Sequence, residues 1–499
     1  MEQERKAGYS HVLKYTGIFG GVQGLNILIG LVRNKVVATL LGPSGMGLAS
    51  LFNTTVNFVS QATNLGISFS AVRHISEAYD KGDEKLMLRY VKTVRVWSLL
   101  TALLGMFVCI ILGPVLSSYT FSWGDHTLHF VLLAPAVALM AVTGGETAIL
   151  KGVRQLRSLA GIQICNVFLA LFVTIPLYYF FGEAAIVPVI VLMALIAMLL
   201  TLHKSFGLYP LSLTDIKKSF DDGMPMVRLG VAFVMAGILG SGAEMLIRSY
   251  LNVTGDLQEV GLYNAGYMLM VTYAGMAFSA METDFFPRLS AVSRLRTTMS
   301  ETVNRQIEVS LLMVSPMLCL LIVGMPYIIP LLFSSEFQPV VGMAQVAVFS
   351  MYIKALSLPI SYTTLARGDS VAYMVTEAVD DVLLVVFIIY GYRWWGLWGT
   401  GVALTASYVV DFIIIYVYTY VRYGYRISFP VVQYASLQFP LGVAAYVVVT
   451  FVDNPYVYWL LNVIFCFLSL SISVSVLRQK TSLWSALKRK VREKMFREE

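Results

Sequence analysis

The sequence predicts an all-α polytopic membrane protein, and three of its properties support that prediction. Of its 499 residues, 57% are hydrophobic and only 13% are charged, which is about half the charged share of a typical soluble domain. Apolar stretches long enough to cross a bilayer as helices recur along the whole chain. Lysine and arginine gather in alternate connecting segments, as expected when successive helices cross the membrane in opposite directions.

Fourteen apolar stretches are predicted to be transmembrane helices, and short polar loops separate them. Their residue ranges are 16–41, 44–72, 93–117, 127–150, 158–181, 184–206, 224–252, 258–285, 306–333, 341–366, 371–391, 395–421, 428–451 and 455–478. No region alternates in hydrophobicity at a period of two often enough to predict an outer-membrane barrel.

The positive charges predict the orientation of these helices. If the N-terminus is cytoplasmic, 31 of the 36 lysine and arginine residues lie in inner segments and only Arg393 lies in an outer loop. The positive-inside rule therefore predicts a multi-pass protein of a bacterial inner membrane with both termini in the cytoplasm. The remaining four cations, Arg33, Lys35, Arg248 and Lys354, fall inside predicted helices.

Metal and redox chemistry receive no support from the sequence. The four cysteines all lie in predicted helices, far apart along the chain, and suggest small apolar fillers rather than a disulfide frame or a metal site. The five histidines have no metal-ligand spacing. We therefore expect no metal and no other cofactor.

Two copies of a six-helix unit are predicted from an internal repeat of about 214 residues. The aligned pairs are Gly47 with Gly261, Arg73 with Arg288, Arg33 with Arg248, Leu150 with Leu365, and Gly182 with Gly396. Because six crossings return the chain to its starting side, the two copies have the same orientation, as in other parallel-repeat transporters. Two such lobes can enclose a central site that opens alternately to either side of the membrane.

The repeat predicts five segments along the chain. The first lobe covers residues 1–206, a cytoplasmic linker covers 207–223, and the second lobe covers 224–425. Two additional transmembrane helices follow in 426–478. The basic amphipathic tail, residues 479–499, is expected to lie on the inner leaflet.

Three of the intramembrane cations are predicted to contact an anionic substrate. Charges inside a membrane cost about 2.5–3.5 kcal/mol each on insertion scales, so they suggest function. Arg33 shares a helix face with Asn26, Arg248 is the repeat mate of Arg33, and Lys354 lies in the middle of its helix. Arginine and lysine bind phosphate oxygens well, which suits a diphosphate. An interfacial anchor for Arg33 and a structural ion pair of Arg248 with Glu244 are the simpler alternatives.

A polar stripe follows the second predicted helix. Its members are Asn53, Asn57, Ser60, Gln61, Asn64 and Ser68. Amide and hydroxyl groups on one face of an otherwise apolar helix suggest a hydrated cavity that contacts sugar hydroxyls. Hydrogen bonding between neighbouring helices is the alternative.

Acidic residues in the predicted helices suggest charge pairing or ion coupling. Glu377, Asp380 and Asp381 share a helix face next to the helix of Lys354. They either neutralise that lysine or bind H⁺ or Na⁺, and Glu244 is assigned to charge pairing as well.

Basic residues also cluster at the predicted cytoplasmic ends of the helices. Arg73, Arg154 and Arg288, with His74 and Lys151 nearby, are candidates for a gate that attracts an anionic substrate to the inner mouth. The positive-inside rule explains much of this charge without any such role.

Four stretches resemble the bacterial polysaccharide flippases, the O-antigen and capsule-type members of the multidrug/oligosaccharidyl-lipid/polysaccharide exporter superfamily. They are "LGPSGMGLASLFN" (41–53), "SAVRHISE" (70–77), "EVGLYNAGY" (259–267) and "FFPRLSAV" (285–292). The likeness covers about residues 1–425. It implies a transporter without covalent catalysis that moves an undecaprenyl-diphosphate-linked oligosaccharide, such as an O-antigen unit of lipopolysaccharide, from the inner to the outer leaflet. The implied partners are membrane lipids and glycan-assembly proteins, and not nucleic acid.

Three other functions stay open. Fourteen helices also resemble the peptidoglycan lipid II flippases, in which the two extra helices border a groove for the lipid tail. A cation-coupled multidrug exporter of the same superfamily is a second alternative, but it would favour acidic and aromatic walls over buried cations. A membrane glycan polymerase or ligase is the third, and the short outer loops argue against it.

Overall fold

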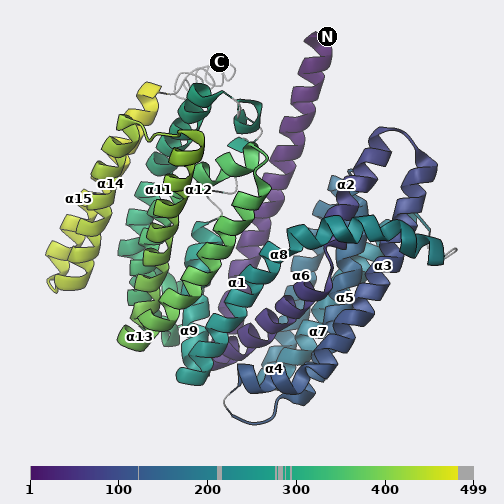
Figure 1. Ribbon diagram of the computed structural model, residues 1–499. Helices are drawn as coiled ribbons and strands as arrows, with labels where there is room; N and C mark the ends of the chain where they lie inside the picture. The colour runs from purple at the N-terminus through teal and green to yellow at the C-terminus, as the bar shows by residue number, and fades with distance from the viewer. Residues whose placement is uncertain are drawn as a thin grey trace, which may run out of the picture. The chain divides into compact units, whose positions relative to one another are not determined.

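The computed structural model describes residues 2–121, 123–210, 216–275, 278, 285–286, 288–292 and 295–480. Every regular element within these residues is helical (Figure 1). Eight helical stretches of the described residues are long and apolar enough to span a membrane. The all-α prediction is therefore confirmed, while the number of fourteen spans stays a prediction. The predicted tail, 479–499, lies outside the described residues except at its first two positions.

The chain divides into two compact units. The first comprises residues 1–264 with 330–337, and the second comprises 265–329 with 338–499. The first unit thus includes the helix that follows the predicted linker, which the repeat assigns to the second lobe. The predicted lobe boundaries, which rest on the repeat alone, stay a prediction.

The first unit consists of helices that pack on one another through apolar faces. Its elements are α1 (Glu2–Thr63), α2 (Ile67–Asp80), α3 (Glu84–Ile111), α4 (Gly113–Thr120), α5 (Thr127–Gly152), α6 (Leu156–Phe181), the 3₁₀ turn η1 (Gly182–Ala185), α7 (Ile186–Leu208), α8 (Ile216–Thr254) and most of α9 (Leu257–Tyr267). A buried cluster that includes Ile75, Val94 and Ile149 joins α2, α3 and α5.

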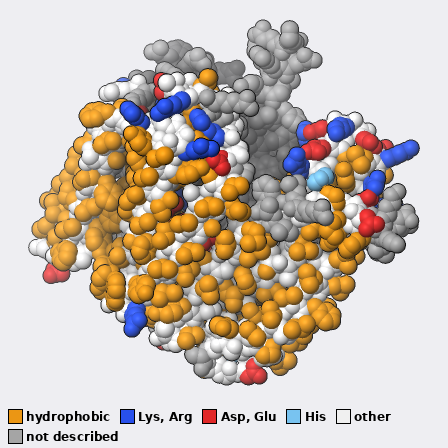
Figure 2. Space-filling view, viewed as in Figure 1, with side chains coloured by type: hydrophobic (Ala, Val, Ile, Leu, Met, Phe, Trp, Pro, Cys, Tyr) orange, Lys and Arg blue, Asp and Glu red, His pale blue; other side chains and the backbone are white. Residues whose placement is uncertain are grey.

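The second unit contains the C-terminal helices. Its elements are the π-helical segment η2 (Met268–Ala274), most of α11 (Arg296–Leu332), part of the 3₁₀ segment η3 (Ser335–Val340), α12 (Val341–Ala366), α13 (Ser370–Tyr423), α14 (Phe429–Phe451) and α15 (Pro455–Lys480). Hydrophobic side chains cover most of the surface that Figure 2 shows for these helices. Phe429, Phe451 and Phe467 of α14 and α15 are 78%, 74% and 66% exposed, as expected of helices that face lipid.

Two long helices break at the positions that separate predicted spans. The first, α1, is interrupted at Gly42, where φ is 64°, and Pro43 follows. Helix α13 is interrupted at Trp395 and Gly396. The first break falls in the gap predicted between 16–41 and 44–72. The second falls at the first two residues of the predicted span 395–421, directly after the predicted gap.

One predicted helix is wrong as a continuous element. The span 44–72 ends at Thr63, and Leu65 and Gly66 adopt positive φ values of 51° and 68° before α2 begins. The cause is a tertiary contact with α8. A Cβ atom at Gly66 would lie 2.2 Å from the carbonyl carbon of Gly230, so the two backbones touch here.

The backbone supports the internal repeat at matched positions. Gly182, at φ 56° and ψ −134°, has nearly the same conformation as its repeat mate Gly396, at φ 58° and ψ −145°. This region of φ/ψ space is accessible almost only to glycine. Helix α1 breaks at Gly42 and helix α8 ends before Asp256, again 214 residues later. Equivalent positions in the two copies therefore share backbone breaks as well as residues.

Repeat mates also contact each other within the first unit. A Cβ atom at Gly47 would lie 2.0 Å from the Leu257 carbonyl oxygen, and one at Gly261 would lie 1.8 Å from the Pro43 carbonyl oxygen. Nearby, Ser50 Oγ donates to Oδ1 of Asn264, its own repeat mate, at 3.0 Å. The second half of α1 and helix α9 thus cross at a near-symmetric point where only glycine fits.

We expect Gly261→Ala to destabilise the protein strongly. The new methyl group would overlap the Pro43 carbonyl oxygen, and relieving such overpacking costs about 1–3 kcal/mol or more. Gly161→Ala is the matched control, because nothing lies within 4 Å of a Cβ at that position of α6. The measurement is the midpoint of thermal unfolding in detergent. Equal midpoints for the two variants would contradict the close crossing.

Candidate functional site

A polar cavity of about 430 Å³ lies within the first unit. Its lining residues are Asn57, Ser60 and Gln61 of α1, Asn64 directly after α1, Met140 of α5, and Gly237, Ser241 and Glu244 of α8. The structure thus brings the predicted polar stripe of the second helix together with Glu244 of the seventh. The volume lies in the range of ordinary small-molecule sites.

The polar stripe of α1 divides between this cavity and other partners. Asn53 does not line the cavity, and its Nδ2 donates to the Ala49 carbonyl oxygen at 2.8 Å. Beyond the break at Gly66, Ser68 Oγ accepts a hydrogen bond from Asn64 Nδ2 at 2.8 Å. The side chain of Asn26, a predicted binding residue, lies outside the described residues.

Arg248 lies behind the cavity wall rather than in the open cavity. Its side chain is 5% exposed, while that of its partner Glu244 is 42% exposed. The guanidinium donates from Nε to Ser50 Oγ at 2.9 Å, from Nη1 to Glu244 Oε2 at 3.2 Å and from Nη2 to Asn264 Oδ1 at 3.2 Å. In this arrangement Arg248 fixes the orientation of Glu244. This is the structural ion pair that the sequence offers as the simpler alternative to substrate binding.

The two cations that are predicted to lie within the membrane part of α1, Arg33 and Lys35, are placed differently from Arg248. Arg33 is half-buried, and its charge acts on the Tyr178 hydroxyl of α6. Lys35 donates from Nζ to the Pro330 carbonyl oxygen at 2.6 Å. Neither side chain lines the 430 Å³ cavity.

Lys354 belongs to a charged cluster in the second unit. Asp380 interacts electrostatically with Glu377, Asp381 and Asp411 and also with Lys354. Lys354 Nζ lies 5.9 Å from the centre of the Phe278 ring. Lys354 thus interacts with the carboxyl groups of Asp380 and Glu377, and Asp381 and Asp411 interact with Asp380 in turn.

Asp411 was absent from the candidate residues. It lies in the second half of α13, beyond the break at Trp395 and Gly396, so its distance in sequence hid its proximity to Asp380. An acidic residue in an apolar stretch needs a partner or a function, and that is the signal that could have found it. Among the described residues, no cluster of histidine, cysteine, aspartate or glutamate is arranged to hold a metal ion.

The proposed cytoplasmic gate residues are mostly engaged with carboxylates. Arg73 Nε pairs with Glu77 Oε1 at 2.9 Å and Arg154 Nη2 pairs with Asp80 Oδ1 at 2.7 Å. The hydrogen bond from Arg73 lowers the pKa of Glu77. Arg288, in the second unit, is exposed. Exposed pairs of this kind contribute little to stability.

A buried ion pair in the first unit escaped the sequence analysis. Arg95, near the start of the predicted helix 93–117, lies inside α3 and pairs with Glu146 of α5, and the two side chains are 3% and 4% exposed. The Nε to Oε1 distance is 2.8 Å and the Nη2 to Oε2 distance is 3.3 Å. Ser205 Oγ also donates to Glu146 Oε2, which adds α7 to the network. A carboxylate in the apolar α5 sequence should have signalled a missing cationic partner.

Two cysteines that lie far apart along the chain are neighbours in the structure. Cys319 of α11 and Cys466 of α15 have their sulfur atoms 3.5 Å apart as free thiols. They pack in an apolar cluster with Val323 and Ala445. Separation along the sequence concealed this contact, because α15 packs on α11 from outside the repeat.

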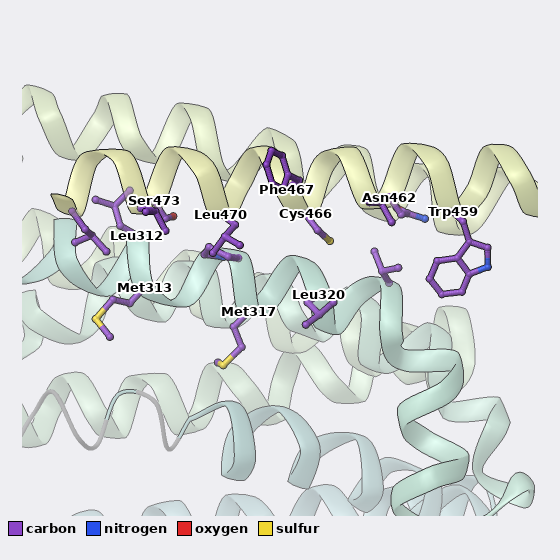
Figure 3. A pocket seen from close by; sticks show the side chains of 15 residues that line it. Leu312, Met313, Met317, Leu320, Trp459, Asn462, Cys466, Phe467, Leu470 and Ser473 are labelled. Carbon is purple, nitrogen blue, oxygen red and sulfur yellow. The ribbon is translucent and has the colours of Figure 1, made fainter. Parts of the chain in front are cut away.

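A long apolar groove of about 630 Å³ runs between α11 and α15 (Figure 3). Helix α11 contributes Leu312, Met313, Met317 and Leu320, and α15 contributes Trp459, Cys466, Phe467 and Leu470 among others. Asn462 and Ser473 are its polar lining residues. The groove therefore suits a hydrocarbon chain rather than a polar ligand.

Known proteins resemble this chain over most of its length. Residues 36–342 match the model of a family described as "Polysaccharide biosynthesis protein". The chain belongs to this family. It is also 22% identical over 403 residues to the lipid III flippases of Escherichia coli (strain K12) and Shigella flexneri, covering 77% of this chain and 92% of each relative.

Solved structures with the same fold are transporters of the MOP superfamily. An inward-facing multidrug resistance MATE family transporter has a TM-score of 0.66 at 15% identity, covering 80% of this chain and 94% of that one. The lipid II flippase MurJ, in an inward closed conformation, has a TM-score of 0.64 at 14% identity, covering 92% of this chain and 99% of that one. The family member described here thus shares its fold with these transporters.

Proposed function

We propose that this member of the polysaccharide biosynthesis family is a flippase for a lipid-diphosphate-linked oligosaccharide. The observation that carries the proposal is the cavity of amide and hydroxyl groups formed by α1, α5 and α8 in the first unit. Asn57, Gln61 and Asn64 offer both donors and acceptors, which suits sugar hydroxyls. The names of the lipid III flippases and of MurJ point to the same substrate class.

The substrate has three chemically distinct parts, and each finds a suitable surface. The glycan contacts the polar cavity of the first unit. The diphosphate is drawn by cations, of which Arg33 is half-buried. The prenyl chain remains in lipid along the apolar groove between α11 and α15. An O-antigen unit is the substrate we favour, and the peptidoglycan precursor lipid II is the alternative with the same chemistry.

Transport proceeds by alternating access in this proposal, from the inner to the outer leaflet. No bond is made or broken, so the chain supplies binding groups and two conformations rather than catalytic groups. The protein lies in the inner membrane with both termini in the cytoplasm. A drug exporter with this fold would handle organic cations, and the amide-rich cavity gives no advantage to such a substrate.

Surface glycan in a deletion strain tests the proposal. The wild-type gene restores surface glycan, and a variant with Asn57→Ala and Gln61→Ala restores less than a tenth of it while inserting normally. A variant with Asn53→Ala, which lies outside the cavity, is the matched control and restores the wild-type amount. Normal surface glycan in the deletion strain itself, together with increased drug sensitivity, would instead support a drug exporter.

The acidic cluster of the second unit is proposed to couple transport to H⁺ or Na⁺. Asp380 interacts with three other carboxyl groups and with Lys354, and binding of a cation by one of these groups would lower their mutual repulsion. We expect Asp380→Asn with Asp381→Asn to remove the ion dependence of flipping in vesicles with imposed H⁺ or Na⁺ gradients. Glu77→Gln, outside the cluster, should keep it. Full ion dependence in the double variant would rule out the coupling role.

A further inference from the structure

A second pocket of the first unit adjoins the polar cavity. It has a volume of about 320 Å³ and is lined by Ser68 of α2, by Met140, Thr143, Gly144, Thr147, Ala148 and Lys151 of α5, and by Ala194 and Ala197 of α7. Met140 belongs to the walls of both hollows. The hydrogen bond from Asn64 to Ser68 joins the lining of the first to the lining of the second. The two hollows therefore form one track along α5, whose second part has mainly apolar walls, with Ser68, Thr143, Thr147 and Lys151 as its polar lining residues.

The break in the backbone at Leu65 and Gly66 creates this track. It ends α1 and redirects the chain, so that Ser68 lies over α5 instead of continuing the α1 stripe. A Cβ atom at Gly144 would lie 3.6 Å from Ser68 Cβ, so a large side chain there would fill the space. Small residues of α5 and α7 form the rest of the floor.

Lys151 is the charged residue among those that line this pocket, and it lies in the last turn of α5. Its side chain is exposed, and among the described residues no carboxylate pairs with it. Its basic neighbours Arg73 and Arg154 differ, because each has a carboxylate partner. Attraction to the negative end of the helix accounts for a lysine at this position, but not for a pocket beside it.

The hydroxyl groups beside Lys151 can donate hydrogen bonds to an anion. Ser68 Oγ accepts from Asn64, which leaves its own proton available. Thr147 has a hydroxyl on the same face of α5. Thr143 differs, because it donates to the Leu139 carbonyl oxygen at 2.7 Å. Lys151, Ser68 and Thr147 together offer a point charge and two hydroxyl donors, which suits phosphate oxygens.

We propose that Lys151, Ser68 and Thr147 bind the diphosphate of the lipid-linked substrate before its glycan enters the adjoining cavity. The inference rests on the proposed function, since the diphosphate belongs to that substrate. It separates two tasks along one track. The Lys151 pocket binds the headgroup, and the cavity of Asn57, Gln61 and Glu244 binds the sugars next to it.

Binding of two probes to the purified full-length protein tests this site. Farnesyl diphosphate represents a lipid headgroup and inorganic pyrophosphate represents a free phosphate, each titrated by calorimetry in detergent. We expect Lys151→Gln to raise the Kd of both probes about tenfold, Thr147→Val to raise it by a smaller factor, and Lys151→Arg to stay within about threefold of the wild type. Lys85→Gln, which removes an exposed lysine at the start of α3, is the matched control and should bind both probes as the wild type does.

Two results would overturn the inference. One is equal affinity of the Lys151→Gln and Lys85→Gln variants for farnesyl diphosphate. The other is a wild-type protein that binds inorganic pyrophosphate but not the farnesyl compound. Flipping of a lipid-linked glycan by the wild-type protein in vesicles is measured separately. A wild type that fails to flip refutes the proposed function, whereas a Lys151→Gln variant with unchanged affinity refutes only this site.

Discussion

Replacing Glu146 by alanine is expected to unfold the first unit at a markedly lower temperature. The substitution leaves the Arg95 guanidinium buried inside α3 with no anionic partner. Breaking a buried ion pair from one side costs about 3–5 kcal/mol, because the desolvated charge remains. The Arg95 interactions with the Pro210 carbonyl oxygen, at 3.0 Å, and with the Phe206 ring, at 4.6 Å, offset only part of this loss.

The double variant Arg95→Met with Glu146→Met sharpens this prediction. It removes both charges and fills the space with apolar atoms, so it should unfold at a higher temperature than Glu146→Ala. Glu77→Ala, which breaks the exposed pair with Arg73, is the control and should leave the unfolding midpoint unchanged within error. A midpoint for Glu146→Ala equal to that of this control would show that the pair does not stabilise the helix packing of the first unit.

Replacing Arg248 by alanine should reduce both stability and transport. Ser50, Asn264 and the Glu244 carboxylate would each lose a hydrogen bond from the guanidinium, and Asn264 would keep the one from Ser50. Because Glu244 is partly exposed to the cavity, water would solvate it, and we expect a loss of about 1–3 kcal/mol rather than the full cost of a buried charge. The free Glu244 carboxylate would then adopt other orientations at the cavity wall.

The pair of variants Arg248→Ala and Glu244→Gln separates positioning from direct substrate binding. If Arg248 orients Glu244, both variants lower the rate of flipping, and only Arg248→Ala also lowers the unfolding midpoint. Arg248→Lys should restore part of the stability, since one of its donors can still reach Glu244. A stable Arg248→Ala variant that loses only substrate affinity would show that the arginine binds the substrate directly.

Local sequence features predicted the helices of this fold well. Gly42 and Pro43 mark a break that the backbone confirms, and apolar length sets most of the other helix ends. The break at Gly66 was not predictable in the same way, because it depends on the approach of Gly230 from a helix far along the chain. A pattern within one segment carries no information about such a contact.

For the same reason, only part of the candidate site was predictable from the sequence. Helical spacing placed Asn57 and Gln61 on one face, and the structure brings this face and Glu244 of α8 to one cavity. The spacing of residues within one helix does not predict which residues of distant helices form pairs. The contact of Arg95 with Glu146 and the approach of Cys319 to Cys466 are both of this kind.

Flipping by the purified protein in vesicles tests the central claim most directly. A fluorescent oligosaccharide on a polyprenyl diphosphate is placed in both leaflets, and an impermeant quencher reports the fraction that reaches the outer one. We predict rapid exchange with the wild-type protein, exchange reduced at least tenfold with Asn57→Ala and Gln61→Ala, and no exchange in empty vesicles. Exchange no faster with folded wild-type protein than in empty vesicles, under H⁺ and Na⁺ gradients of either direction, would contradict the account.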